Sequence, residues 1–515
     1  PQQTATGATA IQDVNLDATL TLPGGEPQTL DPALASDAQS SSYLSEMYDG
    51  LVRFDADGVI APALAERWDV SPDGKRYTFH LRPDGKFQNG APVTAQAFKF
   101  AIDRATDPAL HSPIAGTYLG DIEGVAERLK GAAPSVLGVK VVDEQTLELD
   151  LVAPRSYFLE KLTYPTAFPL DASTVRNGGA NWWQHPNGTG PFALASWDAG
   201  KRLVLQRFDQ YPEPRPKVAK VVVVFNAPAT QYIAAYQAGT FDLVPVITDA
   251  LPTVFADKSQ VLPDVRVYDQ PALTYLGFNT RIPPFDDPWM RRAVALSIDR
   301  AGIIHSALGS SVSLADSIVP PGVAGYDTNE RGYSFNPDLA KRAFANSRYA
   351  KAPPTVVLAD AFAQGQTSVL GPLVAGMLQQ NLGVQVTVRP VPPGGDVGAM
   401  LQGQSTVQMY LTGWQADYPD AQDFVDLLFH TGSDANYGGY SDPQVDRLLD
   451  EAAAEQKEDV RIDLYRKAEH TLLQDAAVVP LWFDRQFYLV RPYVGGIVPQ
   501  ASGGFDFRQA YVRRH

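Results

Sequence analysis

Residues 413–420 read Gly-Trp-Gln-Ala-Asp-Tyr-Pro-Asp, and Phe424 follows four positions later. The residues on both sides, 409–411 and 424–429, are largely apolar, which predicts partly buried surroundings for the acid at Asp417. A carboxylate in such a place needs a cation or hydrogen-bond donors, because burying an unpaired charge is very costly. Its partner is either an internal Arg or Lys or the ammonium group of a ligand, and from the residues alone both remain open.

The composition of the rest of the chain indicates a large globular protein. At 515 residues it is too long for one core, and 44% hydrophobic residues are ample for several packed domains. The formal net charge of −16 disfavours nucleic acid and anionic membrane surfaces as partners, because both select basic patches. The absence of cysteine excludes thiol catalysis, thiolate metal sites and disulfides. No apolar run approaches the roughly 18 residues of a membrane span.

Helical and strand periodicities alternate along most of the sequence. After residues 1–16, expected to be a flexible tail or tether, the pattern predicts a strand at 18–22 and a helix capped by Thr94. Residues 139–151 are expected to form a hairpin. A valine-rich strand, a helix and a strand follow within residues 221–244, and this β–α–β order predicts partly parallel sheets. Later helices are expected to begin at Asp287-Pro288 and Asp442-Pro443.

Motifs of common enzyme classes are absent from the sequence. There is no Gly-x-Ser-x-Gly elbow, no His-Glu-x-x-His and no Gly-x-x-x-x-Gly-Lys-Ser/Thr phosphate loop. The seven histidines are scattered without metal-ligand spacing, so no metal or cofactor is expected. The sequon at Asn187 is interpreted as turn chemistry, and Asp420, Asp423 and Asp426 as helix-start charge or a solvated face. These observations favour a binding protein over an enzyme such as a secreted hydrolase.

Four blocks of sequence carry a resemblance to a known family. The first begins at Leu30-Asp31-Pro32 and runs through Tyr48-Asp49-Gly50-Leu51, residues 61–68, the Pro72-Asp73-Gly74 turn and residues 77–95. The others are Gly188-Thr189-Gly190-Pro191-Phe192, residues 275–300 beginning Tyr-Leu-Gly-Phe-Asn, and the stretch 413–424. In this order they resemble the extracytoplasmic solute-binding proteins of peptide-importing ABC transporters, the oligopeptide- and dipeptide-binding family 5.

The resemblance implies a mixed α/β fold of the periplasmic-binding-protein type, with two hinge-linked lobes and an extra inserted domain. Domain I would comprise residues 17–46, 167–272 and 478–515, and domain II residues 47–166. Domain III, residues 273–477, would form the second lobe. The two chain crossings near residues 269–275 and 477–481 would act as the hinge on which the lobes close around a ligand.

The resemblance also implies a ligand site. In peptide-binding members the aspartate of the Gly-Trp-x-x-Asp motif pairs with the peptide's α-ammonium, and here it falls on Asp417. Such a charge-assisted contact is roughly twice as strong as a neutral hydrogen bond. Trp414 would wall the pocket, and Glu26, Pro27 and Gln28 would lie along the peptide backbone. The remaining expected lining residues are Tyr275, Phe278, Ile114, Leu411 and Tyr418.

Two departures from the family pattern limit what the resemblance implies about the ligand. Residues 409–412 contain no positive charge, although members that hold the peptide carboxylate often have a basic residue there. Ile114 stands where some relatives have an aromatic residue. What holds the ligand's carboxyl end is therefore open, which leaves room for an apolar or unusually long ligand.

The expected function is that of a peptide receptor for an importer. The alternative keeps the fold and changes the ligand to an oligosaccharide, haem or a nickel chelate, but the acid at Asp417 favours peptides. The expected partners are a peptide and the permease subunits of an ABC importer, without nucleic acid, and the chain is expected to be a monomer. Its expected place is outside the cytoplasmic membrane, tethered by a lipid or free in a periplasm.

Overall fold

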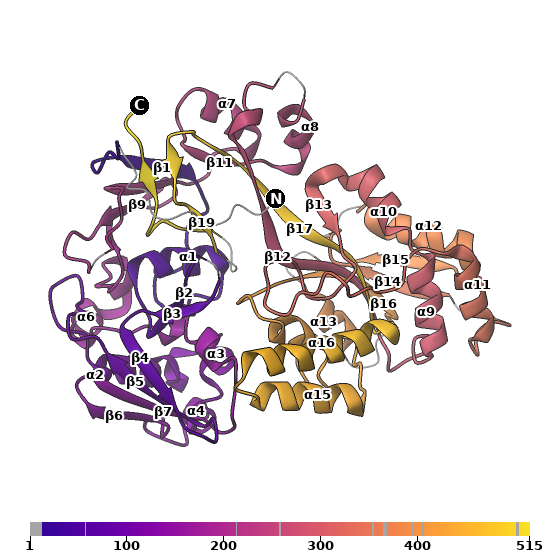
Figure 1. The fold of residues 1–515 in the computed structure, drawn as a ribbon, viewed down its shortest axis with the longest axis horizontal. Coiled ribbons are helices and arrows are strands. Elements are labelled where there is room, and N and C mark those ends of the chain that lie inside the picture. Colours follow the sequence, from indigo (N-terminus) through magenta and orange to yellow (C-terminus); the bar gives the residue numbers. More distant parts are fainter. Residues whose placement is uncertain are drawn as a thin grey trace. The chain divides into compact units, whose positions relative to one another are not determined.

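The computed structural model describes residues 13–515 except 57, 213, 257–258, 353–354, 364–367, 393–394, 403–405 and 501–503 (Figure 1). By its internal contacts the chain divides into two compact units. Unit 1 consists of Pro1–Val152, Phe158–Arg266 and Phe487–His515, and unit 2 of Ala153–Tyr157 and Val267–Gln486. The finer division into domains I, II and III stays a prediction. Within the described residues, no helix combines the length and apolar character needed to cross a membrane.

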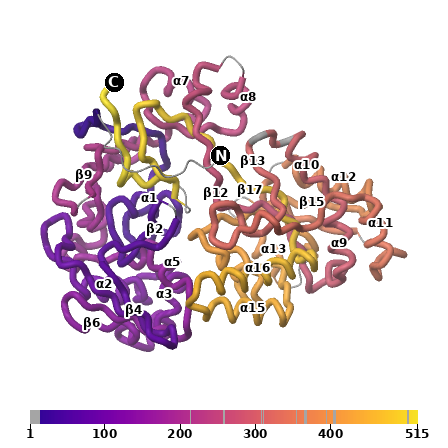
Figure 2. Tube along the Cα trace, viewed as in Figure 1, coloured from indigo at the N-terminus to yellow at the C-terminus, as the bar shows by residue number. Residues whose placement is uncertain are grey.

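The C-terminal segment pairs with residues 14 and 15 inside unit 1. Figure 2 shows the C-terminal segment, in yellow, returning to the indigo N-terminal part of that unit. Val14 forms an antiparallel bridge with Arg513, and the N–H of Asn15 donates to the Val512 carbonyl at 2.8 Å. The last residues of the predicted flexible tail are therefore tied down, whereas its residues 1–12 lie outside the described part of the chain.

One sheet of unit 1 has the strand order β1-β10-β9-β8. Its strands are β1 (Thr19–Pro23), β10 (Lys220–Val224), β9 (Arg202–Arg207) and β8 (Phe192–Asp198), and β1 runs parallel to β10. Leu20, Val221 and Leu205 alternate with less buried neighbours, as expected for a sheet with one face in the core. Helix α1 (Ala38–Met47) begins at Asp37, whose side chain accepts the N–H of Ser40.

The second sheet of unit 1 is an antiparallel one of order β4-β5-β7-β6. It consists of β4 (Ala65–Val70), β5 (Arg76–Leu81), β7 (Thr146–Asp150) and β6 (Val139–Asp143), which confirms the predicted hairpin. Helix α2 (Ala95–Ala105) packs Phe98 and Ile102 onto it, and begins after Thr94 as predicted, although the Thr94 side chain makes no capping hydrogen bond. A small hairpin of β2 (Val52–Phe54) and β3 (Ile60–Pro62) adjoins this core.

The Gly188-Thr189-Gly190 turn is a point of close backbone approach. A Cβ atom on Gly188 would lie 1.9 Å from the Met47 carbonyl oxygen, so no other residue fits there without a backbone shift. The Thr189 hydroxyl accepts the Asp49 N–H at 2.8 Å. The Asn187 side chain accepts the Asn89 N–H at 2.9 Å and donates to Asp171 at 3.0 Å, which supports the interpretation as turn chemistry.

The sheet of unit 2 has the order β17-β12-β16-β14-β15, with β13 also beside β17. The strands are β17 (Val478–Val490), β12 (Val265–Phe278), β16 (Met409–Gln415), β14 (Val356–Asp360), β15 (Val386–Pro390) and β13 (Val312–Leu314). One face packs on α9 (Pro288–Ser297), α11 (Pro337–Asn346) and α12 (Leu370–Leu382). The other packs on α15 (Pro443–Ala454) and α16 (Glu458–Gln474).

The predicted strand–helix–strand order of residues 221–244 and the predicted partly parallel sheets are confirmed, but these two strands do not lie in one parallel sheet. Helix α7 (Tyr232–Gln237) follows β10, but the next strand, β11 (Leu243–Pro245), pairs antiparallel with the end of β17 and not with the sheet of β10. The reason is that β10 already has β1 on one side and β9 on the other, so no edge is left for β11. The parallel pairs are β1 with β10, and β14 with both β15 and β16.

Candidate functional site

Trp414 lies on β16, close to the end of that strand, in unit 2. Strand β16 pairs antiparallel with β12, which sets Trp414 opposite Leu273 and Thr412 opposite Tyr275. Directly paired residues share a face of the sheet, and so do residues two positions apart on one strand. Trp414, its partner Leu273 and Tyr275 therefore belong to the same face. The partly buried Trp414 packs there against the cluster of buried residues that contains Tyr275 and Tyr410.

Asp423 holds the Trp414–Asp417 turn in place. One of its carboxylate oxygens, Oδ2, accepts the Nε1–H of Trp414 at 3.2 Å and the backbone N–H of Asp417 at 2.9 Å. The Asp423 side chain is fully buried, and its other oxygen has no hydrogen-bond partner among the described residues. Burial, followed by the negative charge of Asp417, raises the pKa of Asp423 well above its usual range. The turn thus carries a partly buried acid, Asp417, beside a fully buried one.

The interpretation of Asp420, Asp423 and Asp426 as a solvated face is wrong. Asp420 is 3% exposed and forms an ion pair with Arg461 at 2.6 Å. After Asp420 the chain forms a short π-helix, Gln422–Asp426, which packs against α16. Position 423 is therefore directed into the core. The cation that compensates Asp420 lies 41 residues further along the chain, which the local sequence does not show.

Tyr418, predicted to line the site, is 4% exposed. Its hydroxyl donates to Gln422 Oε1 at 2.5 Å, and the Gln422 amide donates to Asp426 at 3.0 Å. The hydroxyl of Tyr418 therefore serves the internal packing of the turn.

Phe278 and Leu411 lie on the opposite face of the same sheet. Leu411 pairs with Leu276 and Phe278 with Met409, and these residues belong to the core beneath α9 and α12. Phe278 is 1% exposed and Leu411 is fully buried. Side chains alternate along a strand, so residues three apart face opposite ways, as Leu411 and Trp414 do. The prediction that these two residues line the site with Trp414 is wrong.

In unit 1, the segment 25–28 follows β1 and is held by α1. The N–H of Gly25 donates to Gln39 Oε1 and the N–H of Gln28 to Ser40 Oγ, each at 3.0 Å. Both N–H groups are therefore already used, which limits the predicted strand-like contact with a peptide. Pro27 is buried. The exposed Glu26 accepts hydrogen bonds from Trp197 Nε1 at 2.9 Å and from the Gly200 N–H at 3.0 Å.

Ile114 also belongs to unit 1. It is 8% exposed and directly precedes the short helix α3 (Ala115–Leu119). Of the predicted site residues, Trp414, Asp417, Tyr418 and Tyr275 thus belong to unit 2, and Glu26, Pro27, Gln28 and Ile114 to unit 1. Among the described residues, no group of three or more His, Asp or Glu side chains could hold a metal ion.

Residues 59–436 match the model of the bacterial extracellular solute-binding proteins, family 5, in its middle region. The match covers well over half of the chain. The chain belongs to this family.

Individual relatives extend the similarity over nearly the whole chain. The protein is 30% identical over 507 residues to the periplasmic oligopeptide-binding protein OppA of Escherichia coli K12, covering 96% of this chain and 92% of OppA. It is 29% identical over 506 residues to the probable deoxycholate-binding periplasmic protein YgiS of the same organism, covering 95% and 92%. The unliganded open form of the murein tripeptide-binding protein MppA superimposes with a TM-score of 0.84 at 25% identity, covering 98% of this chain and 99% of MppA. These similarities confirm the predicted family and its α/β fold class.

Sequence reasoning missed Asp423 as a support of the motif in this family 5 protein. The sequence shows an acid six positions after Asp417, but its burial depends on the packing of the Gln422–Asp426 turn against α16. The sequence signal for the burial of Asp423 was the apolar pair Phe424-Val425 beside it. Both residues are buried, and on a short turn they bring position 423 inward as well.

Proposed function

We propose that this family 5 solute-binding protein captures peptides outside the cytoplasmic membrane and passes them to the permease subunits of an ABC importer. The observation that carries the proposal is the acid turn after β16, where Asp417 adjoins a fully buried carboxylate that receives no ion pair from the described residues. An ammonium group is the complement of such a site, because it supplies both positive charge and hydrogen-bond donors.

The peptide's α-ammonium would be held by Asp417, with Trp414 beside it. Asp423 would keep the Trp414 ring and the Asp417 backbone in position through the hydrogen bonds of its Oδ2 atom. Glu26, Pro27 and Gln28 of unit 1 would contact the peptide backbone. OppA and the tripeptide-binding MppA, both similar to this chain over nearly its full length, support peptides as the ligand class.

Binding would bring two lobes together around the ligand, with strands β12 and β17 as the segments that pass from one lobe to the other. Both strands begin in one unit and end in the other. No covalent step belongs to this function, since the free energy of binding would drive closure, which the permease recognises. We propose that the receptor is a monomer, either tethered by a lipid or free in a periplasm.

A second ligand class follows from the similarity to YgiS, named as a probable deoxycholate-binding protein. Deoxycholate carries a carboxylate and no amine, so it would bring no positive charge to Asp417. Strand β16 offers it no positive side chain, since residues 409–415 contain none.

The test is Asp417→Ala, measured by calorimetric titration with penta-alanine, N-acetyl penta-alanine and deoxycholate. Loss of a charged hydrogen bond predicts affinity for penta-alanine lower by about 10- to 150-fold. The matched control is Asp434→Ala, another acid of unit 2 that is exposed and makes no hydrogen bond or ion pair to any described residue. Equal binding of the free and N-acetylated peptides to the unmodified protein would contradict the ammonium–Asp417 contact. Binding of deoxycholate alone would contradict the peptide proposal.

A further inference from the structure

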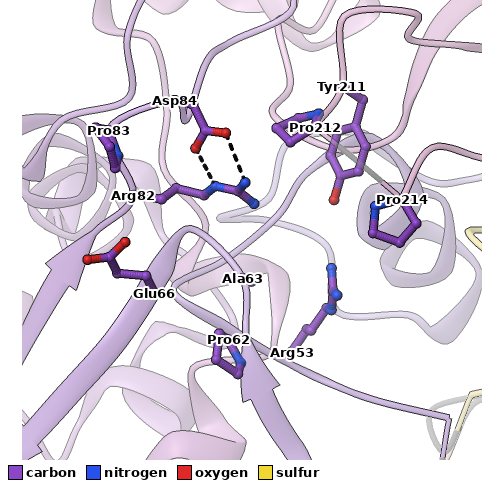
Figure 3. A pocket seen from close by; sticks show the side chains of 10 residues that line it. All are labelled: Arg53, Pro62, Ala63, Glu66, Arg82, Pro83, Asp84, Tyr211, Pro212 and Pro214. Atoms are coloured by element: carbon purple, nitrogen blue, oxygen red, sulfur yellow. Dashed lines mark hydrogen bonds and ion pairs between the residues drawn. The ribbon is translucent and has the colours of Figure 1, made fainter.

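Unit 1 contains a cavity of about 430 Å³ that the proposed peptide site does not use (Figure 3). Its wall comes from β2, β3, β4, the turn after β5 and the loop after β9. The volume falls within the range of small-molecule sites. The lining residues are Arg53, Pro62, Ala63, Glu66, Arg82, Pro83, Asp84, Tyr211, Pro212 and Pro214.

The walls of this cavity combine rigid apolar residues with polar side chains. Four of the lining residues are prolines, whose rings fix the backbone dihedral φ. Tyr211 is fixed at its hydroxyl, which donates to Asp49 Oδ2 at 2.7 Å and accepts from Arg508 Nη1 at 3.1 Å. A cavity with fixed walls binds with little ordering cost, since few side chains have to be immobilised.

Two guanidinium groups lie at the cavity, and they differ in their partners. Arg82 donates from Nε and Nη2 to Asp84 at 2.6 and 3.0 Å, which neutralises its charge and leaves Nη1 without a described partner. The half-buried guanidinium of Arg53 makes no hydrogen bond or ion pair to any residue that the structure describes. A cation left unpaired in a concave site is complementary to an anionic ligand.

Figure 3 shows how these groups are directed. The guanidinium groups of Arg53 and Arg82 and the hydroxyl end of Tyr211 point toward the middle of the cavity. The carboxylate of Glu66 lies beyond Arg82 in this view and is turned away from them. Glu213, between two of the lining prolines in sequence, lies outside the described residues. Since Asp84 pairs with Arg82 and Glu66 is turned away, Arg53 supplies a positive charge at the middle of the cavity that no described group offsets.

We propose that this cavity is a second binding site, which takes a small organic carboxylate. The carboxylate would accept two hydrogen bonds from the planar fork of Arg53, with Nη1 of Arg82 as a further donor. Its apolar body would pack on the prolines and the ring of Tyr211. None of the residues proposed to hold the peptide lines this cavity, so the inference does not depend on peptide binding.

The probe is 4-fluorobenzoate, followed by fluorine NMR line broadening in a titration with the full chain. The neutral analogue 4-fluorobenzamide has nearly the same shape, so it isolates the contribution of the charge. We expect Arg53→Gln to weaken 4-fluorobenzoate binding at least about tenfold and to leave penta-alanine binding unchanged. The matched control is Arg202→Gln, an arginine of the same unit whose side chain is 56% exposed and whose ion pair among the described residues is with Asp198. The thermal unfolding midpoint checks that both variants are folded, and Arg53→Lys, which keeps the charge without the fork, should bind with intermediate affinity.

A second experiment locates the ligand and tests its class. Crystals soaked with 4-bromobenzoate should show an anomalous bromine peak between the prolines and Tyr211. Equal binding of 4-fluorobenzoate to Arg53→Gln and Arg202→Gln, equal binding of the benzamide, or no measurable binding would each overturn the proposal. Inorganic phosphate is the competitor that separates an organic carboxylate from a simple anion. If phosphate displaced 4-fluorobenzoate at equal concentration, the site would recognise charge alone, and the carboxylate assignment would be wrong.

Discussion

Buried carboxylates occur in both units, but their charges are compensated in different ways. In unit 1, Asp49 receives Arg508 Nη1 at 2.5 Å and the Tyr211 hydroxyl at 2.7 Å. In unit 2, Asp420 is matched in the same manner by Arg461, whereas Asp423, three residues later, receives two neutral N–H groups and no cation from the described residues. Where the chain supplies the cation, the acid is part of the framework. Where it does not, a positive ligand can supply it.

Burial without a cation is not by itself a sign of a ligand site. Glu469 of unit 2 is 1% exposed and accepts the N–H groups of Ile318 and Val319 at 2.6 and 3.0 Å. Burial raises the pKa of Glu469 to about 7. Its donors belong to an internal loop, whereas the donors to Asp423 are Trp414 and Asp417, the two residues that we propose contact the ligand. The identity of the donors, more than the burial, distinguishes the two acids.

The largest expected effect comes from breaking a compensated pair. Arg508→Met would leave Asp49 buried without its cation and would remove the hydrogen bond to the Ser45 carbonyl. Loss of one partner of a buried ion pair predicts a free energy of unfolding lower by about 3–5 kcal/mol, measured by urea denaturation of unit 1. The control is Arg514→Met, an exposed arginine near the same chain end. If both variants lost equal stability, the ion pair would not be what stabilises this region.

Local signals in the sequence predicted the elements well and their partners poorly. Helices α9 and α15 begin after Asp287 and Asp442, as the Asp-Pro pairs predict, because an N-cap and a first-turn proline act within one helical turn. The strand Leu243–Pro245 was recognised, but its partner lies more than 200 residues away on β17. No pattern within a short window specifies which sheet edge remains open to such a strand.

From the sequence, only the part of the candidate site that lies in one continuous motif could be proposed. Trp414 and Asp417 come from the resemblance to the family motif Gly-Trp-x-x-Asp. The same resemblance suggested Phe278 and Leu411, but strand alternation places their side chains on the opposite face of the sheet. Asp423 and Arg53 were missed for another reason. Whether such a charged residue serves the packing or a ligand depends on whether a group of opposite charge packs beside it. The example of Asp420 shows that this group can be distant in sequence, because Arg461 lies 41 residues further along the chain.

A smaller effect tests the uncompensated acid directly. An ammonium bound at Asp417 would favour the ionised form of Asp423, so binding would lower a pKa that burial and Asp417 hold well above its usual range. Binding then releases a proton, and peptide affinity should rise with pH over the range in which Asp423 of the free protein titrates, by about tenfold at most. The side chain introduced by Asp423→Asn cannot ionise, so this variant should lose most of the rise in peptide affinity with pH. The facing charges are Asp417 and Asp420, and Asp420 is already paired with Arg461.

Calorimetry in buffers with different heats of ionisation counts the protons released on binding of penta-alanine. The matched control is Glu469→Gln, which removes another buried acid of raised pKa in unit 2 that makes no contact with the motif. This variant should retain the rise in affinity with pH. If peptide affinity rose with pH as steeply in Asp423→Asn as in the unmodified protein, Asp423 would not titrate with ligand binding. Its contrast with Asp420 would then have no functional consequence.

The smallest expected effect separates the hydrogen bond to Asp423 from the aromatic wall. Trp414→Phe keeps a ring on the same face of β16 but removes the Nε1–H that donates to Asp423 Oδ2 at 3.2 Å. Peptide affinity at pH 7 should fall about threefold, the lower end of what one hydrogen bond contributes. Trp482→Phe is the control, because its Nε1–H donates to Asp484 at the same 3.2 Å in the same sheet. Both variants lose one indole–carboxylate bond, so similar losses of stability are expected, while only Trp414→Phe should weaken binding. Weaker binding in both would show that the effect comes from the stability of the sheet, and Asp423 would then belong with the framework acids.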